Sequence, residues 1–345
     1  MSATLQGVPE TTSKAPGDRE PGTPAPAGPR FDGAVAPGGY RWWYVDALSD
    51  DGRHGLVVIA FVGSVFSPYY WWAGHRAPED HVCINVALYG PRERPRPHWA
   101  MTERGAGALD RGAAHFRVGA SGLAWDDGRL TIDIDERTTP FPRLERGYPL
   151  RARITLEAEA LATRTIALDP AGRHRWQPIA PIARVRLDAA EPALAWSGHG
   201  YLDTNDGDEM LEAGFRRWDW SRARMADGTA RLLYDCTGLD GTRRAFGFRI
   251  ARDGTVAEAP VPEVHPLPRG LWGVRRETPA EAPPRLVQAF EDAPFYTRAA
   301  IATRIDGEDC LAVHETFDGR RFASPVVKGM LTMRMPRRRR WPRTG

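Results

Sequence analysis

The chain has 345 residues with a formal net charge of +3, and 42% of them are hydrophobic. This length suits one large domain or two ordinary ones, with a sizeable core. Its 30 prolines, 35 glycines and 12 tryptophans argue against a coiled coil, a helical bundle and a wholly disordered protein.

No stretch approaches the ~20 apolar residues of a membrane-crossing helix. The most apolar one, LVVIAFVGSVF at residues 56–66, is too short and contains Gly63 and Ser64. The first thirty residues carry charges and prolines where a signal peptide has an apolar core. We therefore expect a cytoplasmic protein.

Metal and cofactor motifs are missing from the sequence. Cys83, Cys236 and Cys310 are far apart and form no CxxC pair, which predicts free, buried thiols. The histidines show no HxxxH or HExxH spacing, and there is no P-loop, GxSxG elbow or GxGxxG motif. The sequence predicts no metal and no cofactor.

The basic residues are almost all arginine, since only Lys14 and Lys328 are lysines. Most arginines alternate with acids, which gives nucleic-acid binding little support. The exception is RRRRW at residues 337–341. This basic tail, residues 337–345, is either a solvated end or a contact with an anionic bilayer at about 1 kcal/mol per basic residue.

Residues 1–37 are rich in Pro, Gly, Thr and Ala and predict a disordered leader. Beyond them the signal is β. Residues 151–161 alternate apolar and polar side chains, and residues 123–134 and 301–313 each read as a hairpin around Asp-Gly. That dipeptide supplies the positive φ of tight turns and occurs at Asp32, Asp51, Asp127, Asp206, Asp227, Asp240, Asp253, Asp306 and Asp318.

The fold class predicted from these patterns is mainly β with antiparallel sheets. Only residues 284–290 read as a short helix. A break at residues 188–192 (DAAEP) suggests an N-terminal domain at 38–190 and a C-terminal domain at 191–336. The periodicity does not distinguish two barrels from one extended sandwich.

Two short segments combine a potential acid or base with aromatic rings: His174-Arg175-Trp176 and Tyr201-Leu202-Asp203. In an extended strand, residues i and i+2 point to the same face. His174 therefore lies beside Trp176, and Tyr201 beside Asp203. From the residues alone, Asp203 is more often a turn residue and Trp176 more often core packing.

Several blocks resemble the bacterial carotenoid 1,2-hydratases, also called hydroxyneurosporene synthases. They are GGYRWWYVDAL at residues 38–48, GSVFSPYY at 63–70, NVALYG at 85–90 and WAMTERG at 99–105. The resemblance covers residues 38–335. It implies two lipocalin-like antiparallel β-barrel domains, no cofactor, and water addition to the terminal C1=C2 bond of an acyclic carotenoid such as neurosporene or lycopene.

The resemblance also implies that Asp203, His174, Trp176 and Tyr201 are catalytic, because they match the family's His-x-Trp and Tyr-x-Asp patterns. Asp203 is then the general acid. His174 holds the water or hydrogen-bonds Asp203. The remaining candidate polar and aromatic residues of this region are expected to be structural: His199, Asp206, Asp208, Trp218, Trp220, Tyr234 and Asp235.

Alkene hydration by itself requires such a set of residues. A proton must reach C2, which leaves a tertiary cation at C1. An Asp with a pKa of about 3.9 is protonated only about one part in a thousand at pH 7, and burial can raise a carboxyl pKa by ~3–5 units. Trp176 and Tyr201 would each stabilise the cation by about 0.5–2 kcal/mol.

Two rivals stay open at this point: a non-catalytic lipocalin-like carrier of a polyene, and an acid-initiated isoprenoid cyclase or isomerase. The expected partners are an acyclic carotenoid and water, with no nucleic acid. Because the substrate lives in lipid, we expect peripheral contact with the inner (photosynthetic) membrane. The aromatic segment FSPYYWW at residues 66–72 either contacts the lipid, lines a barrel mouth or packs in the core.

Overall fold

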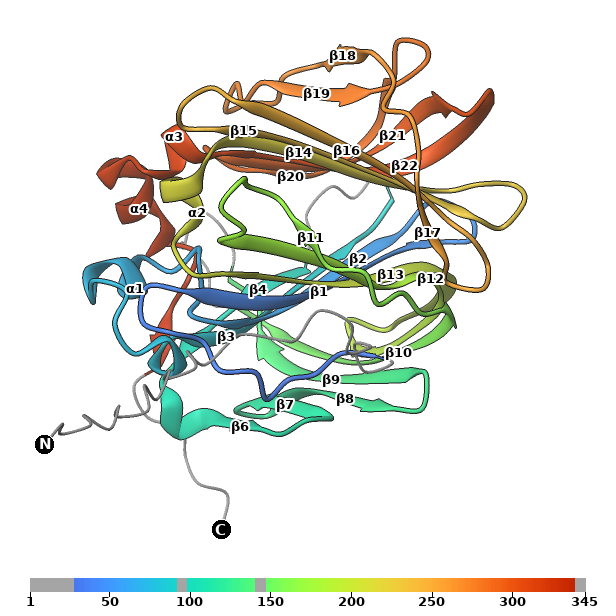
Figure 1. Cartoon of the computed structure of the whole chain (residues 1–345). Helices are drawn as coiled ribbons and strands as arrows, with labels where there is room; N and C mark the ends of the chain where they lie inside the picture. The colour runs from blue at the N-terminus through green and yellow to red at the C-terminus, as the bar shows by residue number, and fades with distance from the viewer. Residues whose placement is uncertain (1–27, 92–97, 140–146, 339–345) are drawn as a thin grey trace, which may run out of the picture.

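The computed structural model describes residues 28–91, 98–139 and 147–338. Strands predominate in these ranges, and every described strand pair but one is antiparallel (Figure 1). The prediction of a mainly β protein is confirmed.

The first sheet has 14 strands. They are β1 (Tyr40–Ser49), β2 (Gly55–Val62), β3 (Val82–Tyr89), β4 (His98–Met101), β5 (Glu103–Arg104), β6 (Leu109–Arg111), β7 (His115–Val118), β8 (Ser121–Asp126), β9 (Arg129–Arg137), β10 (Pro149–Ala160), β11 (Ile166–Ala167), β12 (His174–Glu191), β13 (Leu194–Gly207) and β23 (Arg337–Arg338). Their order is β23-β5-β3-β2-β1-β13-β12-β10-β9-β8-β7-β6, with β4 beside β3 and β11 beside β12.

The second sheet has seven strands in the order β17-β16-β15-β14-β22-β21-β20, and a hairpin, β18-β19, forms a third unit. Their bounds are β14 (Phe215–Arg224), β15 (Ala230–Gly238), β16 (Arg243–Ile250), β17 (Val256–Glu258), β18 (Val264–Leu267), β19 (Arg276–Pro279), β20 (Arg285–Asp292), β21 (Tyr296–Ile305) and β22 (Glu308–Asp318). The short helices are α1 (Pro68–Trp72), α2 (Leu211–Gly214), α3 (Gly319–Phe322), α4 (Pro325–Leu331), η1 (Pro78–Asp80) and η2 (Ala106–Ala108).

The first sheet curls around a core of its own. Side chains from β1 and β3 share this core with side chains from β8, β9 and β10, although these strands are far apart in the sheet order. Trp43 on β1 and Phe116 on β7, for example, have ring centroids 5.4 Å apart. One face of each central strand is buried inside this curl.

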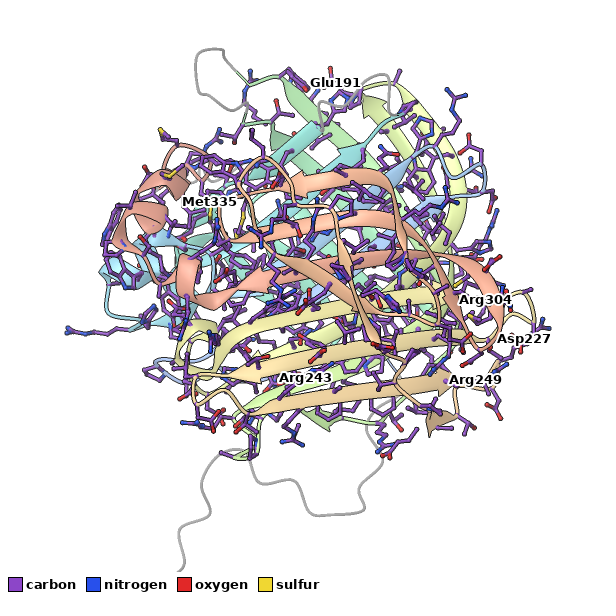
Figure 2. The ribbon with its side chains drawn as sticks, turned by 90° about the horizontal axis from the view of Figure 1, so that it is seen from above. Glu191, Asp227, Arg243, Arg249, Arg304 and Met335 are labelled. Atoms are coloured by element: carbon purple, nitrogen blue, oxygen red, sulfur yellow. The ribbon has the colours of Figure 1, made fainter. Side chains whose placement is uncertain are left out.

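The second sheet covers the other face of β1, β2, β12 and β13, and the β18-β19 hairpin covers the far side of the second sheet (Figure 1). Viewed from above, strand β16, which carries Arg243 and Arg249, lies in front of the first sheet (Figure 2). The central strands are therefore buried on both faces, which explains why all eight residues of β2 are buried. Its apolar run, the most membrane-like in the sequence, is a doubly buried strand.

Both predicted hairpins are confirmed. Asp127 and Gly128 (φ 35° and 84°) join β8 to β9, and Asp306 and Gly307 (φ 53° and 75°) join β21 to β22. Both central residues have positive φ, as a tight turn that matches the twist of the strands requires. The alternation predicted from residue 151 is strand β10, with Ile154 and Leu156 buried.

The helix expected at residues 284–290 is wrong, because this segment belongs to strand β20. β20 pairs with β21 through two register shifts, one after Leu286 and one after Ala289. Each shift moves the following side chains to the other face. The apolar residues therefore do not alternate with a period of two, and the sequence alone looks helical.

The predicted break at residues 188–192 is the end of strand β12 and the first residue of its turn to β13. The two strands pair from His174 with Gly207 to Ala189 with Leu194. The chain leaves the first sheet only after Gly207 and enters the second at Phe215. The change of sheet thus lies beyond the predicted domain division. The division into two domains stays a prediction.

The predicted leader and tail both contribute to the folded part. Residues 28–37 are described, and Phe31 is fully buried against Trp43 and Phe116, so the expectation of disorder is wrong for this part. Arg337 pairs with Glu103 and lies 3.0 Å from Asp80. Residues 1–27 and 339–345 lie outside the described residues.

Cys83 and Cys236 are buried free thiols, as predicted, whereas Cys310 is only half-buried. Within the described ranges, no helix has both the length and the apolar character needed to cross a bilayer.

We predict that Phe31→Ala lowers the free energy of unfolding by about 3–5 kcal/mol, because it empties a site packed between two rings. Urea denaturation followed by tryptophan fluorescence measures this change. Leu271→Ala is the control, because Leu271 is 92% exposed and its loss leaves no cavity. Equal stability of Phe31→Ala and wild type would show that the segment does not anchor the sheet.

Candidate active site

The four predicted residues lie on two neighbouring strands, His174 and Trp176 on β12 and Tyr201 and Asp203 on β13. In β13, Leu202 points into the core of the first sheet, while Tyr201 belongs to the core between the two sheets. Alternation therefore directs Tyr201 and Asp203 toward the second sheet. Trp176 points to the same core, opposite Asn205.

Asp203 is 3% exposed and is held by neutral donors. The Trp176 indole Nε1 donates to Asp203 Oδ2 at 2.8 Å, and the Tyr201 hydroxyl donates to the same oxygen at 2.9 Å. Asn205 Nδ2 donates to Oδ1 at a longer 3.3 Å. No ion pair to Asp203 occurs among the described residues. Because Oδ2 accepts two hydrogen bonds, Oδ1 is the oxygen that can carry a proton.

This environment favours the neutral acid. Burial raises the pKa of Asp203 well above its ordinary value, and the N–H and O–H donors lower it by less. The negative charges of Glu315 and Asp46 raise the Asp203 pKa further. Burial also raises the pKa of Tyr201, so its phenol keeps the proton that it donates to Asp203. A carboxyl group that stays protonated at neutral pH is suited to give a proton to a weak base.

Asp203 faces a small cavity of about 30 Å³ between the sheets. This volume has room for a water molecule beside the carboxyl group. The lining residues come from β1, β13, β14, β15 and β22: Trp42, Tyr44, Asp203, Asn205, Trp218, Trp220, Tyr234 and Glu315. Aromatic rings thus make up most of the wall, which excludes bulk water and offers several π faces.

Sequence reasoning gave Trp218, Trp220 and Tyr234 a structural role, yet they line this cavity. A signal was present, because Trp218 and Trp220 are spaced i and i+2, the same spacing as in the predicted pairs. The sequence does not show that β14 packs over β13. Only the contact of the two sheets brings Trp220 within 5.2 Å of Tyr201, measured between ring centroids.

His174 is buried but lies away from Asp203. It pairs with Gly207 in the sheet, whereas Asp203 pairs with Pro178, which is four positions of about 3.3 Å further along β12. Its Nδ1 lies 2.9 Å from the Tyr40 hydroxyl and its Nε2 lies 3.4 Å from Glu209. The expectation that His174 hydrogen-bonds Asp203 is therefore wrong. Burial lowers the pKa of His174, which favours the neutral imidazole.

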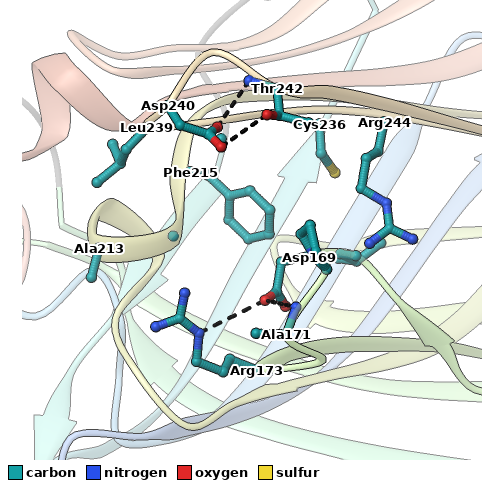
Figure 3. A pocket seen from close by; sticks show the side chains of 14 residues that line it. Asp169, Ala171, Arg173, Ala213, Phe215, Cys236, Leu239, Asp240, Thr242 and Arg244 are labelled. Carbon is teal, nitrogen blue, oxygen red and sulfur yellow. Dashed lines mark hydrogen bonds and ion pairs between the residues drawn. The ribbon is translucent and has the colours of Figure 1, made fainter.

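An open groove of about 330 Å³ lies next to His174. Phe215, whose ring centroid is 4.5 Å from that of His174, separates the imidazole from the groove. Figure 3 shows Phe215 between Asp169 and Cys236, with Arg173 and Arg244 at the rim. A Cβ at Gly214 would collide with the imidazole, so the glycine makes room for His174.

The site contains no constellation typical of a metal centre. Across residues 28–91, 98–139 and 147–338, no group of three or more His, Cys, Asp or Glu side chains is placed to hold an ion. Asp206 and Asp208, which follow Asp203 closely, are both ion-paired with Arg175, at 2.6 and 2.7 Å. These two carboxylates have the structural role that was expected of them.

The chain matches the family model described as carotenoid hydratase CrtC over residues 58–344. The chain belongs to this family. It is 50% identical over 324 residues to the acyclic carotenoid 1,2-hydratase of Thiocapsa roseopersicina, covering 92% of this chain and 78% of the relative. The enzyme of the same name from Rubrivivax gelatinosus is 45% identical, with 90% and 76% covered. Membership of the carotenoid hydratases, inferred above from sequence motifs, is confirmed.

A solved structure shares the fold of this chain. It is the crystal structure of an AttH candidate from Nitrosomonas europaea, with a TM-score of 0.62 and 16% identity, covering 89% of this chain and 99% of that one. At this identity the likeness shows the fold alone. It agrees with the lipocalin-like, mainly β class; the division into two barrels stays a prediction.

We predict that Asp203→Asn stabilises the folded protein at neutral and alkaline pH. When a carboxyl has a higher pKa in the folded than in the unfolded state, the free energy of unfolding of the protein falls from about pH 4 upward. The fall ends when the pH passes the folded-state pKa. The isosteric amide avoids this loss, which reaches about 4 kcal/mol at pH 7 when the acid stays protonated. Thermal unfolding at a series of pH values measures the difference.

The gain in stability of Asp203→Asn must shrink to nothing near pH 4. Asp227→Asn is the control of opposite sign, because hydrogen bonds to Thr229 hold the pKa of Asp227 at about 2. That variant gains no stability as the pH rises. A destabilised Asp203→Asn at pH 8 would show that Asp203 is ionised in the folded protein.

Proposed function

We propose that this protein hydrates the terminal C1=C2 double bond of an acyclic carotenoid, such as neurosporene or lycopene, to a 1-hydroxy carotenoid. The family supports a hydro-lyase acting on this substrate class. The observation that carries the proposal is the buried Asp203, which has neutral hydrogen-bond partners and faces a cavity walled by aromatic rings.

The reaction starts with proton transfer from Asp203 Oδ1 to C2 of the alkene. The two donors on Oδ2 stabilise the carboxylate that remains, and they orient the acid toward the cavity. Because both donors are neutral, they lower the pKa of Asp203 less than a neighbouring arginine would, and the carboxyl keeps its proton. Trp176 and Tyr201 are thus positioning residues for the acid as well as parts of the apolar wall.

The tertiary cation at C1 then needs stabilisation without a nucleophile that would trap it. Each aromatic face within about 6 Å contributes roughly 0.5–2 kcal/mol by cation–π attraction. The rings available around Asp203 are Trp42, Trp176, Tyr201, Trp218, Trp220 and Tyr234. Water then adds to C1 and gives the tertiary alcohol.

In this proposal, His174 holds a water molecule. Its ring is fully buried behind Phe215, which separates it from the open groove, so the water it holds is a buried one. A neutral imidazole can accept a hydrogen bond from a buried water molecule. This keeps the water-holding role expected from the sequence and replaces the contact with Asp203.

We predict that incubation of the wild-type protein with lycopene in heavy-oxygen water yields 1-hydroxy lycopene with the label at C1. Asp203→Asn keeps the shape but lacks the proton, so its rate should fall by about 10²–10⁴-fold. Mass spectrometry of the extracted pigment measures both. An unlabelled isomer would identify a cyclase or isomerase, and unchanged bound lycopene a carrier. A near wild-type rate of Asp203→Asn would remove Asp203 as the acid.

Peripheral contact with the inner membrane is part of the proposal, because a C40 polyene resides in lipid. Exposed apolar side chains support it at one end of the molecule, where α1, α3 and α4 gather (Figure 1). Trp72 on α1 is 56% exposed and Val326 on α4 is 72% exposed. Leu271 and Trp272 are also exposed, and Arg321 on α3 binds the Trp272 carbonyl at 2.7 Å. Tyr70 of the same aromatic segment is fully buried, so that segment is partly core.

We predict that the pair Trp72→Ala and Val326→Asp reduces flotation with liposomes of the inner-membrane type, because it removes an interfacial ring and adds a like charge facing the anionic surface. Tyr148→Ser is the control, since Tyr148 is 44% exposed and contacts His98 at the opposite end of β3. A chain ending at Arg338 tests the tail while keeping the Arg337–Glu103 ion pair. Unchanged flotation of the double variant would show that this end of the molecule does not contact the membrane.

A further inference from the structure

A second carboxylate, Glu315, lines the same cavity as Asp203. It lies on β22, where Val313 and Phe317 on either side of it point into the core between the sheets. Glu315 pairs across the sheet with Trp220, one of the cavity rings. It is 6% exposed. The two carboxyl groups therefore approach one cavity from opposite sheets.

The environment of Glu315 is opposite in kind to that of Asp203. Arg298 Nε lies 2.5 Å from Glu315 Oε1, and the Tyr44 hydroxyl donates to the same oxygen at 2.6 Å. Arg298 is itself buried and reaches the Tyr89 hydroxyl at 3.0 Å. A buried carboxylate is stable when a cation and hydrogen bonds compensate for lost hydration. Glu315 has that compensation, whereas Asp203 has only neutral partners.

Two carboxyl groups whose surroundings differ in this way are suited to opposite tasks, one as acid and one as base. We propose that Glu315 is the general base that takes the proton from the attacking water. The inference rests on the proposed function, because it assigns a residue to the second half of the same reaction.

The step balances in atoms and charge. Asp203 gives H⁺ to C2 and becomes a carboxylate; the oxygen of water forms a bond to C1; one O–H bond of that water breaks and its proton goes to Glu315. Transfer of this proton from Glu315 to Asp203, through water in the cavity, restores both groups. Before the reaction, the opposite charges of Arg298 and Glu315 cancel. In the intermediate, the positive charge at C1 and the negative charge of the new Asp203 carboxylate also cancel. The buried site thus carries no net charge at either stage.

A merely structural role for Glu315, as the partner of Arg298 and Tyr44, predicts a different result from that of a base. If Glu315 acts after protonation, its loss blocks hydration but leaves proton delivery by Asp203 intact. The cation then returns to an alkene by losing a proton. In D₂O this reversal leaves deuterium in the terminal group of recovered lycopene.

The test is Glu315→Gln with lycopene in D₂O, scored for 1-hydroxy product and for deuterium in the recovered pigment. We expect hydration to fall by about 10²–10⁴-fold while deuterium still enters the substrate. The control is Glu136→Gln, since Glu136 is equally buried and ion-paired with Arg104 at 2.8 Å but lies outside the cavity. That variant should hydrate lycopene at the wild-type rate.

Hydration by folded Glu315→Gln within a few-fold of wild type would overturn the inference, and so would parallel loss of hydration and of deuterium uptake. If Glu315→Gln does not fold, Glu315→Asp replaces it: a shortened base must slow hydration more than deuterium uptake, and an equal decline overturns the inference. If wild type itself forms no hydroxylated carotenoid, the proposed function is wrong and the role of Glu315 falls with it. Wild-type hydration with an unimpaired Glu315→Gln overturns only the inference.

Discussion

The whole arrangement depends on one constraint: the Asp203 carboxyl is removed from water without being given a cation. An arginine at hydrogen-bond distance would lower its pKa and leave no proton to donate. Trp176 and Tyr201 supply hydrogen bonds instead, which hold the carboxyl in place and add no charge. In the proposed mechanism, burial between the two sheets keeps the Asp203 carboxyl protonated, and the neutral donors orient it.

The architecture makes this burial possible. The central strands of the first sheet have an apolar face inside the curl and another face under the second sheet. A polar side chain on the second face, such as Asp203 on β13, is covered by the rings of β14 and β15. The same layer contains carboxylates that are paired with arginines. Glu315 pairs with Arg298, and Asp46 pairs with Arg222, whose Nε lies 2.6 Å from the Asp46 carboxylate. Uncompensated and compensated acids thus lie side by side between the two sheets.

In the proposed reaction, water and polyene make opposite demands on the protein surface, and the structure has a polar groove and exposed apolar side chains near one another, since α2, which lines the groove, contacts α3. The groove next to His174 has charged residues at its rim (Figure 3). The end of the molecule with α1, α3 and α4 exposes Trp72 and Val326 and encloses rings such as Phe66 and Phe322, with centroids 5.8 Å apart.

The sequence by itself determined the local features: the alternation of β10, the Asp-Gly turns at Asp127 and Asp306, and the shared face of Tyr201 and Asp203. These follow from the period of a strand and from the φ preferences of one or two residues. The sequence could not reveal the bulges that make β20 a strand, the burial of Phe31, the partners of His174, or Trp220 and Glu315 at the cavity. Each of these depends on which strand packs over which other strand. Only the tertiary structure decides that, because the contacts join residues far apart in the chain.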